Sequence, residues 1–160
     1  HQAAGIVGNF AVETGNFNYQ QEINPTVKGS QGGYGLAQWT GPRRRQLESY
    51  ASQRGMDVSS YEAQYAFLSH ELNGEYKNVL RQMQNAGSVE ESTRIFMEQF
   101  ERPGIPHFDK RLAYAMGAAN GDFGDAGLNP QYGPGGSGGM GGSTQIIDQI
   151  PLVLMPWGAG

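Results

Sequence analysis

The stretch that decides the fold opens the chain and reads Ala3-Ala4-Gly5-Ile6-Val7-Gly8-Asn9-Phe10-Ala11-Val12-Glu13-Thr14-Gly15. Its apolar residues recur every three or four positions, which predicts a helix over residues 1–12 with one buried face. Gly5 and Gly8 each lower helix stability by roughly 1 kcal/mol relative to alanine, so we expect another element to pack closely against this helix. No N-cap residue precedes the apolar run, and we therefore expect the domain to begin upstream of residue 1.

Glu13 is expected in the last turn of this helix, because Gly15 is a favourable residue just past a helix end. A carboxylate there faces unpaired carbonyl groups and the negative end of the helix dipole. Burial against Phe10 or Phe17 would disfavour the ionised form further. Both effects raise the pKa of a carboxyl group, as a general acid requires at neutral pH. Glu13 is therefore a candidate catalytic acid, and the alternative is a surface glutamate near a helix end.

A loop-rich segment follows over residues 16–39, and it leads into Gly33-Tyr34-Gly35-Leu36-Ala37-Gln38-Trp39-Thr40. Long loops in a compact domain are usually functional or disordered, and the aromatic residues argue against disorder. We interpret the segment as one wall of a substrate groove, in which a small β-hairpin could form. Gln38 can donate and accept hydrogen bonds with sugar hydroxyl and N-acetyl groups, and Tyr34, between glycines, is the more exposed aromatic candidate. Trp39 either stacks on a sugar face or belongs to the core.

Helix start and stop signals recur through the middle of the chain. They are a proline before and a glycine after residues 43–54, and the capping-box patterns Ser59-x-x-Glu62 and Ser88-x-x-Glu91. A last helix is predicted over residues 109–119. The aromatic residues along these helices favour a core over a binding surface. The predicted fold class is therefore mainly α.

Four short motifs are weak one by one but specific in their order and spacing. They are the opening stretch, Gly35-Leu36-Ala37-Gln38-Trp39-Thr40-Gly41-Pro42-Arg43-Arg44, His70-Glu71-Leu72-Asn73 and Phe100-Glu101-Arg102-Pro103-Gly104, with Arg111 in a following helix. Together they span residues 3–116 and resemble the phage tail lysozyme family. The resemblance implies a lysozyme-like helical domain over 1–120 and cleavage of the peptidoglycan glycan strand. It also implies that Glu13 is the catalytic acid, although Thr14 replaces the commoner serine.

The expected function is that of a muramidase, which hydrolyses the β-1,4 bond between N-acetylmuramic acid and N-acetylglucosamine. Such a protein would be carried on the phage tail or virion and would open the cell wall locally during infection. Two alternatives stay open. One is a lytic transglycosylase, which gives 1,6-anhydro products. The other is a virion structural subunit that keeps the fold without activity.

A second acid is harder to assign, although hydrolysis of a glycosidic bond usually uses two carboxyl groups. Glu22 lies in the groove loop and could hold a water molecule. Glu71 is expected at a structural or exposed position. Glu101, next to Arg102, is either the second acid or a salt-bridged structural acid. If no second acid serves, the substrate's own N-acetyl group or a hydroxyl takes part, as in a lytic transglycosylase.

Composition excludes several other classes of function. The 160 residues carry a net charge of −4, without the basic surface of a nucleic-acid-binding protein. The chain has no cysteine, so it can form no disulfide and no thiolate nucleophile. No apolar run reaches the eighteen or so residues of a membrane span. The three histidines lack the spacing of metal ligands, and we predict neither a metal nor another cofactor.

The end of the chain differs in composition, because residues 117–160 hold 13 of the 25 glycines and no lysine or arginine. Residues 121–143 are expected to form a glycine-rich linker. Residues 144–160 are apolar, with prolines that favour an extended segment. We expect this segment to dock on other virion or tail proteins, or to begin a further domain.

Overall fold

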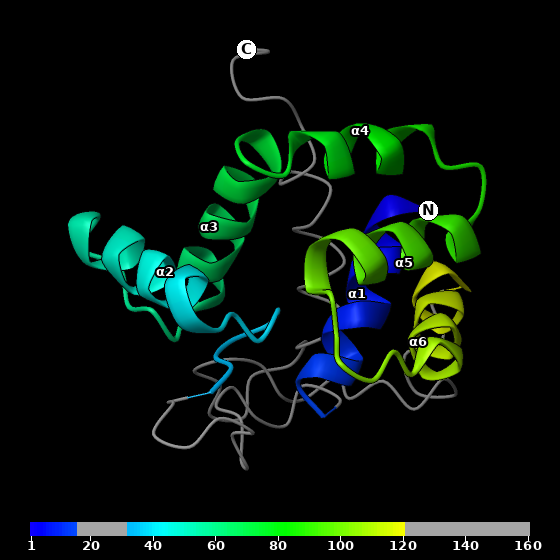
Figure 1. The fold of residues 1–160 in the computed structure, drawn as a ribbon, viewed down its shortest axis with the longest axis horizontal. Helices are drawn as coiled ribbons and strands as arrows, with labels where there is room; N and C mark the ends of the chain where they lie inside the picture. The colour runs from blue at the N-terminus through cyan, green and yellow to red at the C-terminus, as the bar shows by residue number, and fades with distance from the viewer. Residues whose placement is uncertain (16–31, 121–160) are drawn as a thin grey trace.

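The computed structural model describes residues 1–15 and 32–120, and within these ranges the fold is helical. In chain order the elements are α1 (Gln2–Glu13), α2 (Gly41–Gln53), α3 (Tyr61–Asn73), α4 (Lys77–Asn85), α5 (Val89–Phe96), the π-helical turn η1 (Met97–Glu101) and α6 (Phe108–Asn120). The predicted mainly α class is confirmed. Figure 1 shows α2 and α3 on one side, α1, α5 and α6 on the other, and α4 across the top.

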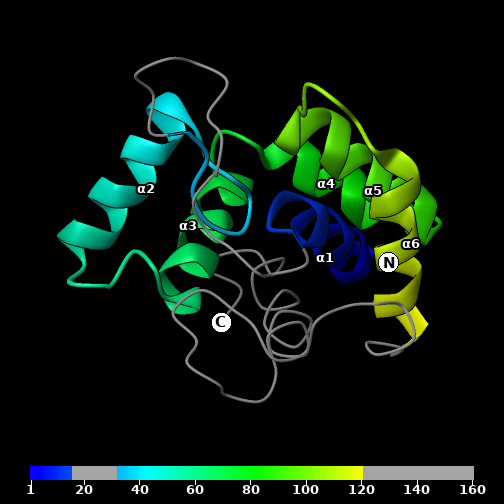
Figure 2. The same cartoon turned by 90° about the horizontal axis from the view of Figure 1, so that it is seen from below.

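Helix α1 is the central element, because its residues 4–11 are all buried. It contacts both α5 and α6, and Figure 2 shows it between the α2–α3 pair and the α5–α6 pair. The two glycines explain how close these contacts are. A Cβ atom on Gly5 would lie 2.6 Å from Ser92 Oγ of α5, and one on Gly8 would lie 2.8 Å from the backbone nitrogen of Ala115 in α6. The close packing expected from Gly5 and Gly8 is therefore confirmed.

The core consists largely of the residues that the sequence placed on the buried helix faces. Phe10 of α1 packs edge-on against Phe96 of α5, with ring centroids 5.8 Å apart. Phe96 in turn stacks on Phe100, at 4.5 Å. Trp39 meets Phe67 of α3 at 5.5 Å, which brings the second group of helices into the same hydrophobic cluster.

Helix boundaries follow the predicted signals with one correction. Ser88 caps α5 as expected, because its Oγ accepts a hydrogen bond from the Glu91 backbone at 3.0 Å. The cap of α3 is Ser60 rather than Ser59, and it accepts from the backbone nitrogen of Ala63. Ser59 instead donates to the Asp57 carboxylate. The local Asp-x-Ser turn thus shifts the helix start by one residue.

Two elements were missed by the sequence analysis. Helix α4 lacks a side-chain N-cap, and only its residues Val79, Leu80 and Met83 are buried. The π-helical turn η1 follows α5 directly, and Arg102 ends it in the left-handed conformation at φ 49°. Such π-turns are rare and occur often at functional sites.

The groove segment is described only in part. Tyr34 and Trp39 form an antiparallel bridge in which each backbone nitrogen donates to the other's carbonyl oxygen, at 3.0 and 2.9 Å. This tight turn is the only trace of the suggested hairpin among residues 32–40. Glu22 and Phe17 lie outside the described residues, as do the linker at 121–143 and the apolar segment at 144–160.

Substitution of Gly8 by alanine tests the close contact between α1 and α6. The new methyl group would overlap the α6 backbone, so we expect Gly8→Ala to lower the free energy of unfolding by about 1–3 kcal/mol, despite alanine's better helix propensity. Gly87→Ala is the matched control, because its Cβ would meet its nearest atom at 3.8 Å. The control should change stability by less than about 0.5 kcal/mol. Urea unfolding measures both, and equal stability of Gly8→Ala and wild type would refute the packing argument.

Candidate active site

A cavity of about 510 Å³ opens where three parts of the chain meet. The end of α1, the turn at 33–40 and the segment from the end of η1 into α6 form its walls. Its lining residues are Val12, Glu13, Gly33, Ala37, Gln38, Thr40, Glu101, Arg102, Pro103, Gly104, Ile105, His107 and Arg111. Both Glu13 and Glu101 are among them. The cavity has the size of a typical small-ligand site.

Glu13 is the last residue of α1, as the sequence predicted, and Gly15 follows in the left-handed conformation at φ 55°. Its side chain is 18% exposed and forms an ion pair with Arg111, with 2.8 Å between Oε1 and Nη1. The sequence predicted apolar surroundings for this carboxyl group, but the structure also places a charged side chain next to it. The helix end disfavours the ionised form, whereas the neighbouring guanidinium favours it.

Arg111 is a buried cation that joins α6 to α1. Its Nη1 also donates to Asn9 Oδ1 at 3.1 Å, and its Nε donates to the Pro106 carbonyl oxygen at 2.6 Å. Asn9 and Glu13 are four residues apart and so share one face of α1. Asn9 is itself fixed, because its amide nitrogen donates to the Thr93 carbonyl of α5 at 3.1 Å. The sequence analysis marked Arg111 as part of a motif but did not foresee its contact with Glu13.

Glu101 reaches the same cavity from the last residue of η1. The residue is half-buried, but its Oε1 atom is inaccessible and has no hydrogen-bond partner among the described residues. Burial raises the pKa of Glu101 well above its ordinary value, and the negative charge of Glu13 raises it further. Arg102 does not supply the salt bridge offered as the structural alternative, because it is exposed and donates to the Gln99 carbonyl instead.

The three predicted sugar-binding residues have different positions. Gln38 lines the cavity, and its backbone is left-handed at φ 49°. Tyr34 is half-buried and does not line the cavity; the Arg44 guanidinium lies over its ring, 5.1 Å from the centroid. Trp39 is only 1% exposed. Its burial supports the core alternative and leaves no ring face free to stack on a sugar.

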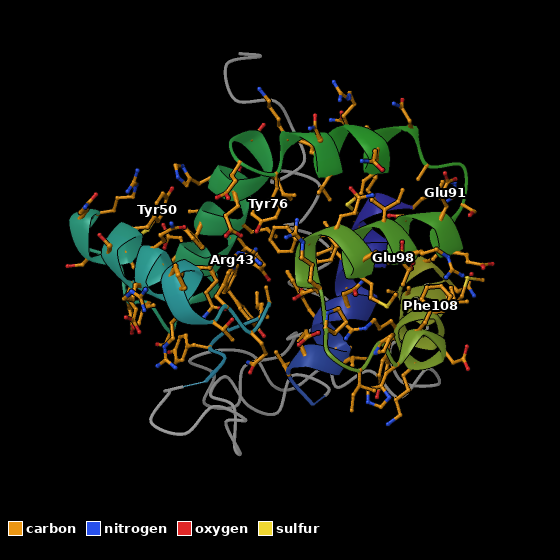
Figure 3. All side chains as sticks on the ribbon, viewed as in Figure 1. Arg43, Tyr50, Tyr76, Glu91, Glu98 and Phe108 are labelled. Atoms are coloured by element: carbon orange, nitrogen blue, oxygen red, sulfur yellow. The ribbon has the colours of Figure 1, made fainter. Side chains whose placement is uncertain are left out.

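Trp39 belongs to a polar cluster that holds the turn at 33–40 in place. Its Nε1 donates to Glu71 Oε2 at 2.9 Å, and Arg43 binds the two oxygens of the same carboxylate at 2.8 and 2.7 Å. Arg43 also donates to the Phe100 carbonyl at 3.0 Å and lies 4.6 Å from the centre of the Tyr76 ring. Figure 3 shows Arg43 and Tyr76 facing one another between the two groups of helices. Glu71 is thus structural and buried, not exposed.

The segment 102–107 supplies two cavity residues, Ile105 and His107, that the sequence analysis did not name. Ile105 is 69% exposed at the cavity. His107, like Arg102, has a left-handed backbone, at φ 46°. Two such residues flanking a Pro-Gly-Ile-Pro run hold an unusual loop conformation, which is often found at ligand sites. The closely spaced prolines and glycine of this run were the sequence signal that could have identified the loop.

This geometry defines a helical protein with two carboxyl groups on one sugar-sized cavity. Residues 1–121 match the protein family described as phage tail lysozyme, so the chain belongs to that family. It is accordingly a lysozyme-like phage protein that acts on peptidoglycan. No curated protein and no solved structure matches the chain.

Two further properties concern the described residues only. None of their helices has the length and apolar character that crossing a membrane would require. Their His, Asp and Glu side chains form no group of three or more that could hold a metal ion.

Replacing Glu71 tests the cluster that holds the turn at 33–40. In Glu71→Gln, Arg43 loses its bidentate carboxylate partner, and we expect a loss of about 2–4 kcal/mol in unfolding free energy. Glu48→Gln is the control, because it breaks the partly exposed Arg44–Glu48 pair and should change stability by about 0–1 kcal/mol. Chemical denaturation compares the two variants. A Glu71→Gln protein as stable as the control would show that the cluster contributes little.

Proposed function

We propose that this protein is a muramidase that cleaves the β-1,4 bond between N-acetylmuramic acid and N-acetylglucosamine. The observation that carries the proposal is the pair of carboxyl groups, Glu13 and Glu101, on one cavity of a phage tail lysozyme family member. The two groups come from elements far apart in sequence, α1 and η1. Two carboxyl groups beside the scissile bond are what glycoside hydrolysis usually needs.

In this proposal Glu13 protonates the glycosidic oxygen as the bond to the leaving sugar breaks. A positive charge then develops on the remaining sugar ring, and a carboxylate at Glu101 stabilises it or activates the attacking water. Arg111 acts as a positioning residue, because it pairs with Glu13 and is itself held by Asn9 and Pro106.

The glycan would lie along the walls of the same cavity. Gln38 presents a polar side chain there, although its Nε2 also donates to the Gly35 carbonyl at 2.8 Å. Ile105, from the segment 102–107, adds an exposed apolar surface to the cavity lining. Tyr34, outside the cavity lining, would contact the glycan only where the strand extends past the cavity. The proposed substrate contacts are therefore Gln38 first and Tyr34 second, with Trp39 in a supporting role.

A lytic transglycosylase is the second candidate, favoured by the burial of the Glu101 carboxyl. A carboxyl group whose pKa is raised in this way keeps its proton, and while protonated it cannot act as the base that activates water. In a transglycosylase the C6 hydroxyl of the muramic acid attacks instead, and no water is consumed. Mass spectrometry of the digested glycan separates the reactions, because anhydro ends are lighter by one water than reducing ends. We expect reducing ends.

The direct test of the proposal is the substitution Glu13→Gln. The amide keeps the size of the side chain but cannot donate the proton, so the rate of wall cleavage should fall by about 10²–10⁴-fold. Clearing of purified cell walls measures the rate, and thermal unfolding checks that the variant is folded. Glu48→Gln, on the partly exposed face of α2, should cleave like wild type.

Two results would contradict the assignment. A folded Glu13→Gln protein that clears walls at the wild-type rate would exclude Glu13 as the acid. A wild-type protein without any activity on walls would favour the structural-subunit alternative.

We also propose that the protein is carried on the virion and that residues 144–160 dock on another tail or virion protein. The family match covers residues 1–121, which supports a cleaving domain that works without the residues beyond it. A chain truncated after Asn120 should keep wall cleavage and lose incorporation into particles. Loss of cleavage by a folded truncated protein would refute this division of roles.

A further inference from the structure

Three charged side chains of the active-site cavity are buried or half-buried: Arg111 contributes one positive charge, while Glu13 and Glu101 bring two carboxyl groups. Arg102 and His107 also line the cavity, but they are exposed to solvent, which screens their charges. With both carboxyl groups ionised, this buried group would carry a net negative charge. Burial of an uncompensated charge is strongly unfavourable, and a carboxyl group in that position keeps its proton instead.

We propose that Glu13 and Glu101 hold a single proton between them at neutral pH, with Arg111 as the counter-charge, and that this proton resides on Glu101 in the free protein. The inference rests on the proposed function and deepens it, because it says where the catalytic proton is stored.

The contacts of Arg111 support this distribution. Its Nη1 lies 2.8 Å from Glu13 Oε1, so the ionised carboxylate is the one at Glu13. Its other hydrogen bonds go to Asn9 and the Pro106 carbonyl, not to Glu101. Glu101 Oε1 is inaccessible and has no hydrogen-bond partner among the described residues. A neutral carboxylic acid is far less costly in such a place than a carboxylate.

The other charged groups near Glu101 do not change the balance. Its charged neighbours are Glu13 of α1, Arg43 of α2, Glu71 of α3 and Arg111 of α6. Arg43 is bound by both oxygens of Glu71, so these two charges cancel each other. Burial and the Glu13 carboxylate therefore outweigh the two arginines and raise the pKa of Glu101.

In the proposed reaction the shared proton passes between the two carboxyl groups. It moves from the Glu101 oxygen to Glu13, which leaves Glu101 as the carboxylate and keeps the number of protons constant. Glu13 then gives the proton to the leaving oxygen as the glycosidic bond breaks. Both carboxyl groups are ionised at that stage, opposite the positive charge on the sugar ring.

Carbon NMR of the full chain labelled at the glutamate carboxyl carbons tests the proposal without any substrate. Wild type, Glu13→Gln and Glu101→Gln are titrated with acid and base. The carboxyl signal that is absent from each variant identifies the glutamate that was replaced. In wild type one proton should leave the pair well above the ordinary glutamate pKa of about 4.3. In Glu101→Gln, Glu13 should titrate at or below that value, because Arg111 pairs with it. In Glu13→Gln, Glu101 should titrate lower than in wild type.

Stability against pH gives a second, independent measurement. The folded state keeps the Glu101 proton at pH values where the unfolded state has lost it. Wild-type stability should therefore fall as pH rises from the ordinary glutamate pKa through the raised one. Glu101→Gln lacks this carboxyl group and should not lose stability in this way. The difference in melting temperature, variant minus wild type, should therefore increase as pH rises over the same range.

The outcomes separate this inference from the proposed function. If both carboxyl groups of wild type titrate near the ordinary glutamate pKa, the proposal of a shared proton is wrong, even if the protein cleaves cell walls. Glu13 titration that is unchanged in Glu101→Gln would contradict it as well. A shared proton in a protein that does not cleave walls would support the inference and refute the proposed activity. If Glu101→Gln fails to fold, the wild-type and Glu13→Gln titrations decide.

Discussion

The buried guanidinium of Arg111 is the contact on which the site depends. It lies between α1 and α6, pairs with Glu13 at 2.8 Å and donates to Asn9 one turn earlier on the same helix. This geometry is available only because Gly8 lets the α6 backbone approach α1 without a side chain between them. The close packing of two helices and the geometry of the proposed site thus depend on the same contact. Gly8 lowers the intrinsic stability of α1 as a helix, but it also allows Arg111 to reach the last turn of α1.

The opposite wall of the cavity depends on a second polar contact. Glu71 accepts from Trp39 and from both ends of the Arg43 fork, so it fixes the turn at 33–40 to α2 and α3. Arg43 also reaches the Phe100 carbonyl, next to Glu101 at the end of η1. The turn that presents Gln38 and the π-helical turn that presents Glu101 are therefore connected through one side chain. Each wall is held by an arginine with a carboxylate partner.

The sequence predicted the helical class, the end of α1 at Glu13 and the close packing at Gly5 and Gly8, because these depend on local spacing and on glycine. It left the role of Trp39 open, since a tryptophan beside a loop suits a groove or a core equally well. The ion pair between Glu13 and Arg111 joins residues 98 positions apart, and no local pattern encodes it. The π-turn escaped prediction for a related reason: an extra residue in a helix leaves the apolar spacing almost unchanged.

The central claim is that the glycan binds in the cavity between the end of α1 and the segment 102–107. Backbone-amide NMR of Glu13→Gln, the variant that we expect to be inactive, tests it most directly when the protein is titrated with a soluble tetrasaccharide of alternating N-acetylglucosamine and N-acetylmuramic acid. We expect the largest shift changes at Gln38, Gly104 and Ile105. A second cavity, of about 320 Å³ and lined by Tyr50 and His70 among others, is the internal control and should not respond. Changes confined to that second cavity, or no changes at saturating sugar, would contradict the account.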